Sequence, residues 1–174
     1  MLTIATDGAC PGNPGPGGWA WVTADGRSDS GGEPAPSTNN RMELMAVEQA
    51  LNAFPDDDLL IQTDSQLVVN TFTQWLPDWI SNGMMTASGS PVANASLVLR
   101  IERLTRGREV AWGHVRGHRG HQLNEQADLL AVAAAARFAG LSREPDTFQC
   151  GSCFLTLPVT RRAYGDPPTC SDCA

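Results

Sequence analysis

The sequence predicts an α/β domain built on a mixed sheet, and three observations carry that prediction. Strand-like segments come first, before any helix-like segment. Helix-like and strand-like segments then alternate, which is the order expected when helices connect strands of one sheet. With 174 residues, of which 41% are hydrophobic, the chain is large enough for one compact core and a small appendage.

Three predicted strands open the chain. Residues 2–10 form one strand-like run and residues 17–24 form a second, with a turn rich in glycine and proline between them. Turn residues of this kind between two strand-like runs favour a hairpin. A weaker third strand is predicted within residues 27–34.

The next segments predict a helix, a strand and a second helix. Residues 40–54 have a helical pattern that stops near Pro55. The short apolar run at residues 59–63 is typical of a buried parallel strand. The helical stretch at residues 65–75 would then begin the crossover to the next strand.

The remaining segments complete the predicted domain. Residues 75–92 are rich in Trp, Gly, Ser and Pro, and we expect them to form an irregular protrusion. A helix is predicted at residues 94–106, a short strand at residues 109–112, and an alanine-rich helix at residues 122–139.

Charge and hydropathy narrow the class of protein. The formal net charge is −7, and all 12 basic residues are arginine, so a generic nucleic-acid binder is disfavoured unless bound cations offset the acidic groups. The sequence has no run of about 18 apolar residues and no basic N-terminal stretch before a hydrophobic one. We therefore expect no membrane span, no signal peptide and a cytoplasmic location. A monomer is expected as well.

Four acidic residues stand in segments where a lone carboxylate would be costly. Asp7 interrupts the first strand-like run, Asp64 ends an apolar run, Glu43 shares a helical face with apolar residues, and Asp128 lies among Ala and Leu. Buried charge is expensive unless it is paired or bound to metal. If the fold gathers these oxygen ligands, the simplest neutralising ion is Mg²⁺ or Mn²⁺.

Each of these acids also has an ordinary explanation. Glu43 lies three residues after Asn40 and fits a capping-box position. Asp7 would serve as a turn residue and Asp64 as a helix cap, while Asp128 would pair with an arginine. None of these explanations accounts for the motifs in which all four acids stand.

Five sequence blocks surround the acids in a fixed order: Thr6–Cys10, Gly12–Trp19, Thr38–Leu44, Thr63–Gln66, and Gly117–His121 followed by Asn124–Asp128. Together they resemble the motif series of type 1 ribonuclease H. The resemblance covers roughly residues 1–140, and we place the boundary of the catalytic domain at residues 1–142. It implies a five-stranded mixed sheet flanked by helices, with the active site at strand ends.

The resemblance also implies an activity and its cofactors. The expected reaction is endonucleolytic cleavage of the RNA strand of RNA–DNA hybrids, leaving 5′-phosphate and 3′-hydroxyl ends. Two Mg²⁺ or Mn²⁺ ions would be held by Asp7, Glu43, Asp64 and Asp128, because paired ions suit in-line displacement at phosphorus. His118 would lie on a flexible loop beside them, to shuttle a proton or assist product release, unless it is an ordinary exposed histidine.

Substrate contacts are implied at seven further positions. The 2′-hydroxyl is the group that distinguishes RNA from DNA, and amide side chains can both donate and accept hydrogen bonds to it. The positions that match family contacts to the hybrid are Cys10, Gly12, Asn13, Thr38, Asn39, Gln66 and Trp75. Asn39 could equally be a residue that starts a helix.

The predicted protrusion departs from the family pattern. In many relatives this element is rich in lysine and arginine, whereas residues 75–86 of this chain contain no cation. We therefore expect the protrusion to contribute little to hybrid affinity.

Four cysteines near the C-terminus predict a second, smaller module at residues 143–174. Two C-x-x-C pairs are separated by 16 residues, which is a strong signature of a structural zinc site. The predicted ligands are Cys150, Cys153, Cys170 and Cys173. Two disulfides and a redox pair are the alternatives. This zinc ribbon would either contact protein or nucleic acid or serve as a purely structural cap.

Two other functions fit parts of this sequence. One is a binding module that recognises hybrids without cutting them, and the other is a nuclease of the same fold that acts on DNA. A missing acid would favour the binding module, but all four are present. The amides of Asn13, Asn39 and Gln66 argue against the DNA nuclease.

Overall fold

The computed structural model describes residues 1–117, 120–142, 147–149 and 156–158. The chain divides into two compact units, Met1–Ala139 and Gly140–Ala174. In the second unit, strands β6 (Thr147–Gln149) and β7 (Thr156–Pro158) pair in antiparallel fashion. The four cysteines predicted to bind zinc lie outside the described residues, as does His118.

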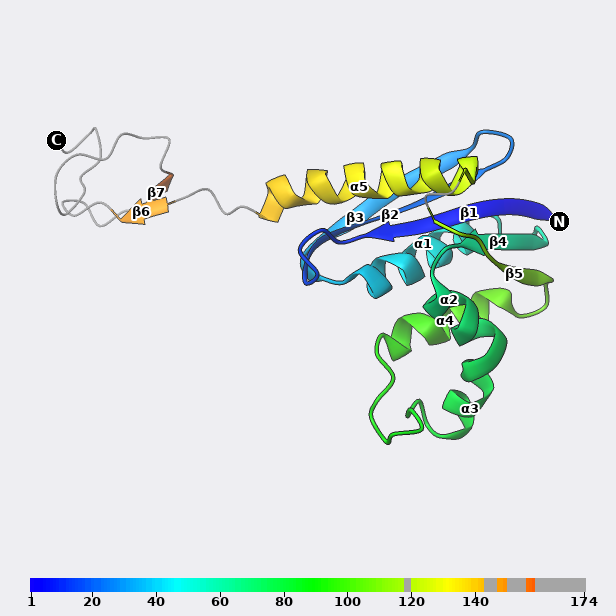
Figure 1. Cartoon of the computed structure of the whole chain (residues 1–174). Helices are drawn as coiled ribbons and strands as arrows, with labels where there is room; N and C mark the ends of the chain where they lie inside the picture. Colours follow the sequence, from blue (N-terminus) through cyan, green and yellow to red (C-terminus); the bar gives the residue numbers. More distant parts are fainter. Residues whose placement is uncertain (118–119, 143–146, 150–155, 159–174) are drawn as a thin grey trace. The chain divides into compact units, whose positions relative to one another are not determined.

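The first unit is built on a five-stranded mixed sheet (Figure 1). The strands are ordered β3-β2-β1-β4-β5. Strand β1 is antiparallel to β2 and parallel to β4, and β4 is parallel to β5. The bounds are β1 Leu2–Ala9, β2 Gly15–Thr23, β3 Ser28–Ser37, β4 Leu59–Thr63 and β5 Val110–His114. The predicted mixed sheet is confirmed.

Strand β3 is longer than the sequence predicts. It was expected to end by residue 34, but it continues through Pro34 and Pro36 to Ser37. Proline lacks an N–H and is tolerated where a strand needs no partner on one side. Since β3 lies at the edge of the sheet, the two prolines do not end it.

Two layers of helices cover the sheet, one on each face (Figure 1). Helices α1 (Asn39–Ala53) and α4 (Ala95–Thr105) pack in a large apolar core that includes Ile4, Leu51 and Ile61. Helix α5 (Gln122–Ser142) covers the other face with small residues, such as Ala127 against Ala5 and Val22. None of the described helices is both long and apolar enough to cross a lipid bilayer.

The segment predicted as an irregular protrusion is partly helical. After α2 (Gln66–Asn70) the chain continues through the π-helical turn η1 (Thr71–Trp75) into α3 (Leu76–Ser81). Pro77 lies in the first turn of α3, where its missing N–H costs nothing and its fixed φ suits a helix. The prediction was therefore wrong for residues 76–81, because this proline starts a helix.

Candidate active site

The sheet register brings Asp7 next to Asp64. In the parallel pair β1 and β4, Ile4 lies opposite Ile61 and Ala5 opposite Gln62. The same register continued by two residues sets Asp7 beside Asp64, at the carboxyl ends of neighbouring parallel strands. Side chains alternate along a strand, so Asp7 shares the face of Ala5, which packs beneath α5. Helix α5 also carries Asp128.

A glycine next to Asp7 brings helix α1 close to the same strand. A Cβ at Gly8 would overlap the backbone of Met42 and Glu43, so only glycine allows this approach. The backbone of Glu43 therefore lies against β1, one residue from Asp7. A close packing contact between β1 and α1 thus unites two acids that are 36 positions apart in the sequence.

The pKa of Asp7 is raised by the charges of all three other acids. Its side chain is buried, with the residue only 7% exposed. The pKa of Asp7 is raised to about 8, chiefly by burial and then by the charge of Asp64, while a 2.7 Å hydrogen bond from the Gly8 N–H opposes the rise. Asp128 and Glu43 add smaller contributions in the same direction. The four predicted acids therefore form one cluster.

Glu43 accepts a hydrogen bond from a side-chain hydroxyl and takes no part in capping the N-terminus of α1. Burial raises the pKa of Glu43, the Ser65 hydroxyl that donates to its Oε2 lowers it, and Asp64 raises it. The N-cap of α1 is Thr38, whose Oγ1 accepts from the Arg41 N–H, so Glu43 lies beyond the capping-box position. The capping explanation for Glu43 is wrong.

Three residues that support the acids were not predicted as site residues. Ser65 accepts from the Val68 N–H as the cap of α2 and also donates to Glu43. Asn124 is 2% exposed, and its Nδ2 donates to Asp64 Oδ2 at 3.4 Å. A Cβ at Gly117 would overlap Asp64 Oδ2, so a larger residue there would displace the Asp64 carboxylate. Their presence in the motif blocks was the available signal.

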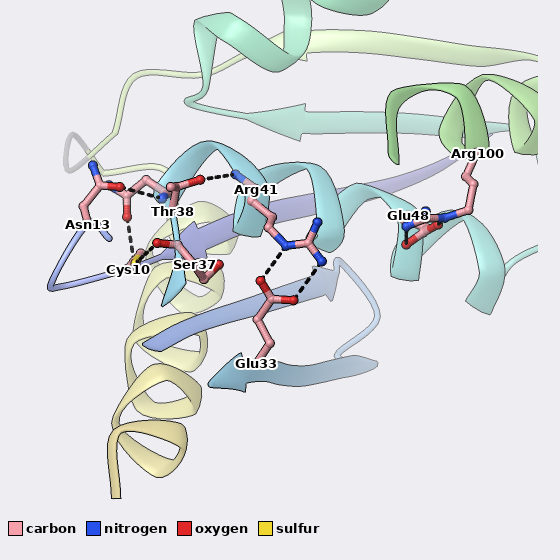
Figure 2. A network of polar contacts seen from close by, with 9 residues as sticks. Cys10, Asn13, Glu33, Ser37, Thr38, Arg41, Glu48 and Arg100 are labelled. Carbon is pink, nitrogen blue, oxygen red and sulfur yellow. Dashed lines mark hydrogen bonds and ion pairs between the residues drawn. The ribbon is translucent and has the colours of Figure 1, made fainter. Parts of the chain in front are cut away.

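The predicted substrate residues near the first turn form a connected group. The Cys10 N–H donates to Asn39 Oδ1 at 2.6 Å, and the Asn39 N–H donates to Asn13 Oδ1 at 3.2 Å. The Cys10 thiol donates to the Ser37 carbonyl, as Figure 2 shows. Among the described residues, neither asparagine Nδ2 has a hydrogen-bond partner, so both remain available to a ligand.

An open groove of about 380 Å³ extends from this group to Asp128, one of the four acids. Its lining includes Asp128 on one side and Cys10, Asn13 and Asn39 on the other. Gly12 lies in the turn between them, where a Cβ would sit 3.0 Å from the Pro14 carbonyl. One predicted metal ligand, Asp128, thus shares a surface depression with three predicted substrate contacts.

The other predicted substrate residues have local partners. Thr38 caps α1, as described above, and Gln66 Nε2 donates to Asn70 Oδ1 at 2.7 Å. Trp75 is 36% exposed, and its ring centroid lies 5.5 Å from that of Trp79. The lining of the groove does not include these three residues.

The chemistry of the cluster fits a hard divalent cation. Three carboxylates lie within electrostatic reach of the buried carboxylate of Asp7, and a concentration of negative charge of that kind is costly without a cation. Within the described part of the chain, however, no three His, Cys, Asp or Glu side chains are already arranged as a metal shell.

Comparisons with known proteins identify the family of this chain. A family model described as RNase H matches residues 1–136. A ribonuclease H from Cupriavidus necator is 46% identical over 134 residues, which cover 75% of this chain and 92% of the relative. A ribonuclease H from Phenylobacterium zucineum is 46% identical over 148 residues, which cover 80% and 96%.

A solved structure supports the same conclusion. LC9-RNase H1, described as a type 1 RNase H with the type 2 active-site motif, is similar with a TM-score of 0.70 and 32% identity. The match covers 78% of this chain and 72% of that one. The fold and these comparisons together define an enzyme with the ribonuclease H-like fold. This chain belongs to the RNase H family and is a ribonuclease H.

Proposed function

We propose that this enzyme hydrolyses the RNA strand of RNA–DNA hybrids endonucleolytically, and that it leaves 5′-phosphate and 3′-hydroxyl ends. The observation that carries the proposal is the buried Asp7, whose pKa is raised by burial and by three neighbouring acids. The groove that reaches Asp128, a second acid of the cluster, is also lined by Asn13 and Asn39. The relatives that match most of this chain are ribonucleases H.

The residues that would hold two Mg²⁺ or Mn²⁺ ions are Asp7, Glu43, Asp64 and Asp128. When bound, these ions supply positive charge against the phosphate and lower the pKa of a coordinated water. Their binding would favour the ionised form of Asp7, since a cation offsets the charge of the neighbouring acids.

The protein's own groups orient the acids and the substrate. The Gly8 N–H fixes one oxygen of Asp7, the Ser65 hydroxyl fixes Glu43, and the Asn124 amide fixes Asp64. Groups that support ligands in this way commonly change affinity or activity when removed.

On the substrate side, the Asn13 and Asn39 amides, with the backbone near Cys10 and Gly12, would hydrogen-bond to ribose 2′-hydroxyls. His118, outside the described residues, would carry a proton to or from the reacting phosphate.

A panel of four substrates tests the proposal. The same sequence is prepared as an RNA–DNA hybrid, duplex RNA, duplex DNA and a DNA duplex with one ribonucleotide, and each is incubated with Mg²⁺. We expect cleavage within the RNA of the hybrid, with products that a 5′-phosphate-dependent exonuclease degrades. Cleavage of duplex DNA at a comparable rate would contradict it.

We also propose one structural Zn²⁺ bound by Cys150, Cys153, Cys170 and Cys173. These residues lie outside the described part of the chain, so the support is the spacing of the two cysteine pairs. Metal analysis of the purified protein should give one zinc per chain. Substitution of Cys170 by Ser should release it, while two disulfides would give no zinc and no free thiol among these four.

A further inference from the structure

Half of the eight arginines that the structure describes are neutralised by acids of this chain. Among the described residues, four arginines form ion pairs at 2.5–2.8 Å: Arg27 with Asp25, Arg41 with Glu33, Arg100 with Glu48 and Arg106 with Glu102. Figure 2 shows the pairs of Arg41 and Arg100. These side chains are therefore poorly suited to hold the phosphates of a substrate.

Two other described arginines bind neutral groups. Arg108 Nη1 donates to the carbonyls of Leu51 and Pro55, at 3.4 and 3.0 Å. Arg137 Nη2 donates to Ser30 Oγ at 3.1 Å. Among the arginines that the structure describes, only Arg103 and Arg116 make no side-chain hydrogen bond or ion pair.

Arg116 lies next to the acid cluster because its neighbours are fixed to β4. The Val115 N–H donates to the Thr63 carbonyl at 3.0 Å. On the other side, Gly117 packs so closely that a Cβ would overlap Asp64 Oδ2. The backbone of Arg116 is thus held between contacts to Thr63 and Asp64, while its side chain is exposed.

We propose that Arg116 binds the phosphate of the RNA strand that adjoins the scissile one. Guanidinium groups bind phosphate through two parallel hydrogen bonds, and they remain charged at all relevant pH values. A nucleic-acid enzyme with a net charge of −7 needs such a contact, since the protrusion supplies no cation between residues 75 and 86. This inference rests on the proposed function, because it takes the hybrid as substrate.

The experiment compares Arg116→Ala with Arg103→Ala. Arg103 is a matched control because it is exposed, also lacks a partner among the described residues, and lines a depression with Glu48 and Arg100 on α1 and α4. Cleavage kinetics are measured on one hybrid, and hybrid affinity is measured in Ca²⁺ across a salt series. Thermal melting of both variants checks that the fold is unchanged.

We expect Arg116→Ala to raise KM about tenfold and to change kcat less than about twofold. The slope of log K against log salt should fall by about 0.7–0.9, which corresponds to one phosphate contact. Arg116→Lys should keep the slope and lose part of the affinity, because it keeps the charge without the planar fork. Arg103→Ala should leave KM and the slope unchanged.

Three results would overturn the inference. They are an unchanged KM and slope in Arg116→Ala, an equal loss in Arg103→Ala, or a loss confined to kcat. If the wild-type enzyme cut no hybrid at all, the proposed function would fail. The salt series would then still report whether Arg116 contacts a nucleic-acid phosphate, so the two failures are distinguishable.

Discussion

Two regions of the molecule differ in the charged residues that they contain. One is the pair of carboxyl ends of β1 and β4, and the other is the protrusion around α3. At the strand ends, several acids are buried or half-buried within reach of one another, and burial raises the pKa of two of them. In the protrusion, Asp78 is the only charged residue between residues 75 and 92, while Trp75 and Ile80 are exposed. One region concentrates negative charge, and the other offers almost none.

This difference separates two tasks that a nuclease must perform. A buried acid cluster is poor at attracting a polyanion, but it can hold cations where the phosphate reacts. A protrusion without cations can contact a hybrid only through apolar and hydrogen-bonding groups. General electrostatic attraction must therefore come from other residues, and we expect bound metal ions and Arg116 to supply it.

The largest expected effect is the loss of one acid. Asp7→Asn keeps the shape of the side chain and removes the charge at the centre of the cluster. We expect kcat to fall on the order of 10³-fold or more, while hybrid affinity changes little. Single-turnover cleavage and a filter-binding assay measure the two quantities. Retained cleavage would refute the catalytic assignment of the cluster.

The groups that orient the acids should have an intermediate effect. Asn124→Ala removes the amide that bonds Asp64, and we expect about 10–100-fold lower activity at low Mg²⁺. Added Mg²⁺ should restore part of the lost activity, because the substitution affects the orientation of a metal ligand, the Asp64 carboxylate. A titration of activity against Mg²⁺ tests this, and an unshifted midpoint would count against the role.

Ser65 has two partners, so its variants should separate two effects. Ser65→Ala removes the donor to Glu43 and the cap of α2, which should cost about 1 kcal/mol of stability. Ser65→Thr keeps the hydroxyl, so its stability and its activity should both be closer to those of the wild type than the values of Ser65→Ala are. Urea unfolding and cleavage rates measured on the same two variants distinguish the cap from the support of Glu43.

The raised pKa of Asp7 predicts a pH dependence of the metal-free protein. The pKa of Asp7 is about 8 in the folded state and 3.8 for an ordinary aspartate, so the folded state binds an extra proton between these pH values. The stability due to protonated Asp7 is complete below about pH 4 and is lost as the pH rises through 8. Asp7→Asn lacks this loss.

Urea unfolding in EDTA measures the difference. Relative to Asp7→Asn, the wild type should lose about 1–3 kcal/mol between pH 5 and pH 8. Mg²⁺ should restore the wild type at pH 8 and affect the variant less, because the ion removes the repulsion among the acids. If the free energy of unfolding of the two proteins in EDTA changes with pH in the same way, the raised pKa of Asp7 is disproved.

The sequence was sufficient for most of the fold but for less of the site. The apolar strands and glycine turns predict the sheet, and the motif order places the four acids together. The sequence alone could not show the hydrogen bond from Ser65 to Glu43 or the one from Asn124 to Asp64, because these contacts depend on how α2 and α5 pack beside the strands. The sequence also does not show that β3 is an edge strand, so its prolines predicted an earlier end of the strand.

The smallest effect should come from adding charge to the protrusion. Asp78→Arg introduces a cation on α3, and we expect hybrid affinity to rise about two- to fivefold at low salt, with a steeper salt dependence. Asp78→Asn is the matched control, since it removes the acid without adding a cation and should give a smaller gain. Asp78 lies in the first turn of α3, where a cation is unfavourable, so stability should fall by about 0.5 kcal/mol. If Asp78→Arg leaves both affinity and salt slope unchanged, the protrusion does not approach the hybrid backbone, and its exposed Trp75 serves another purpose.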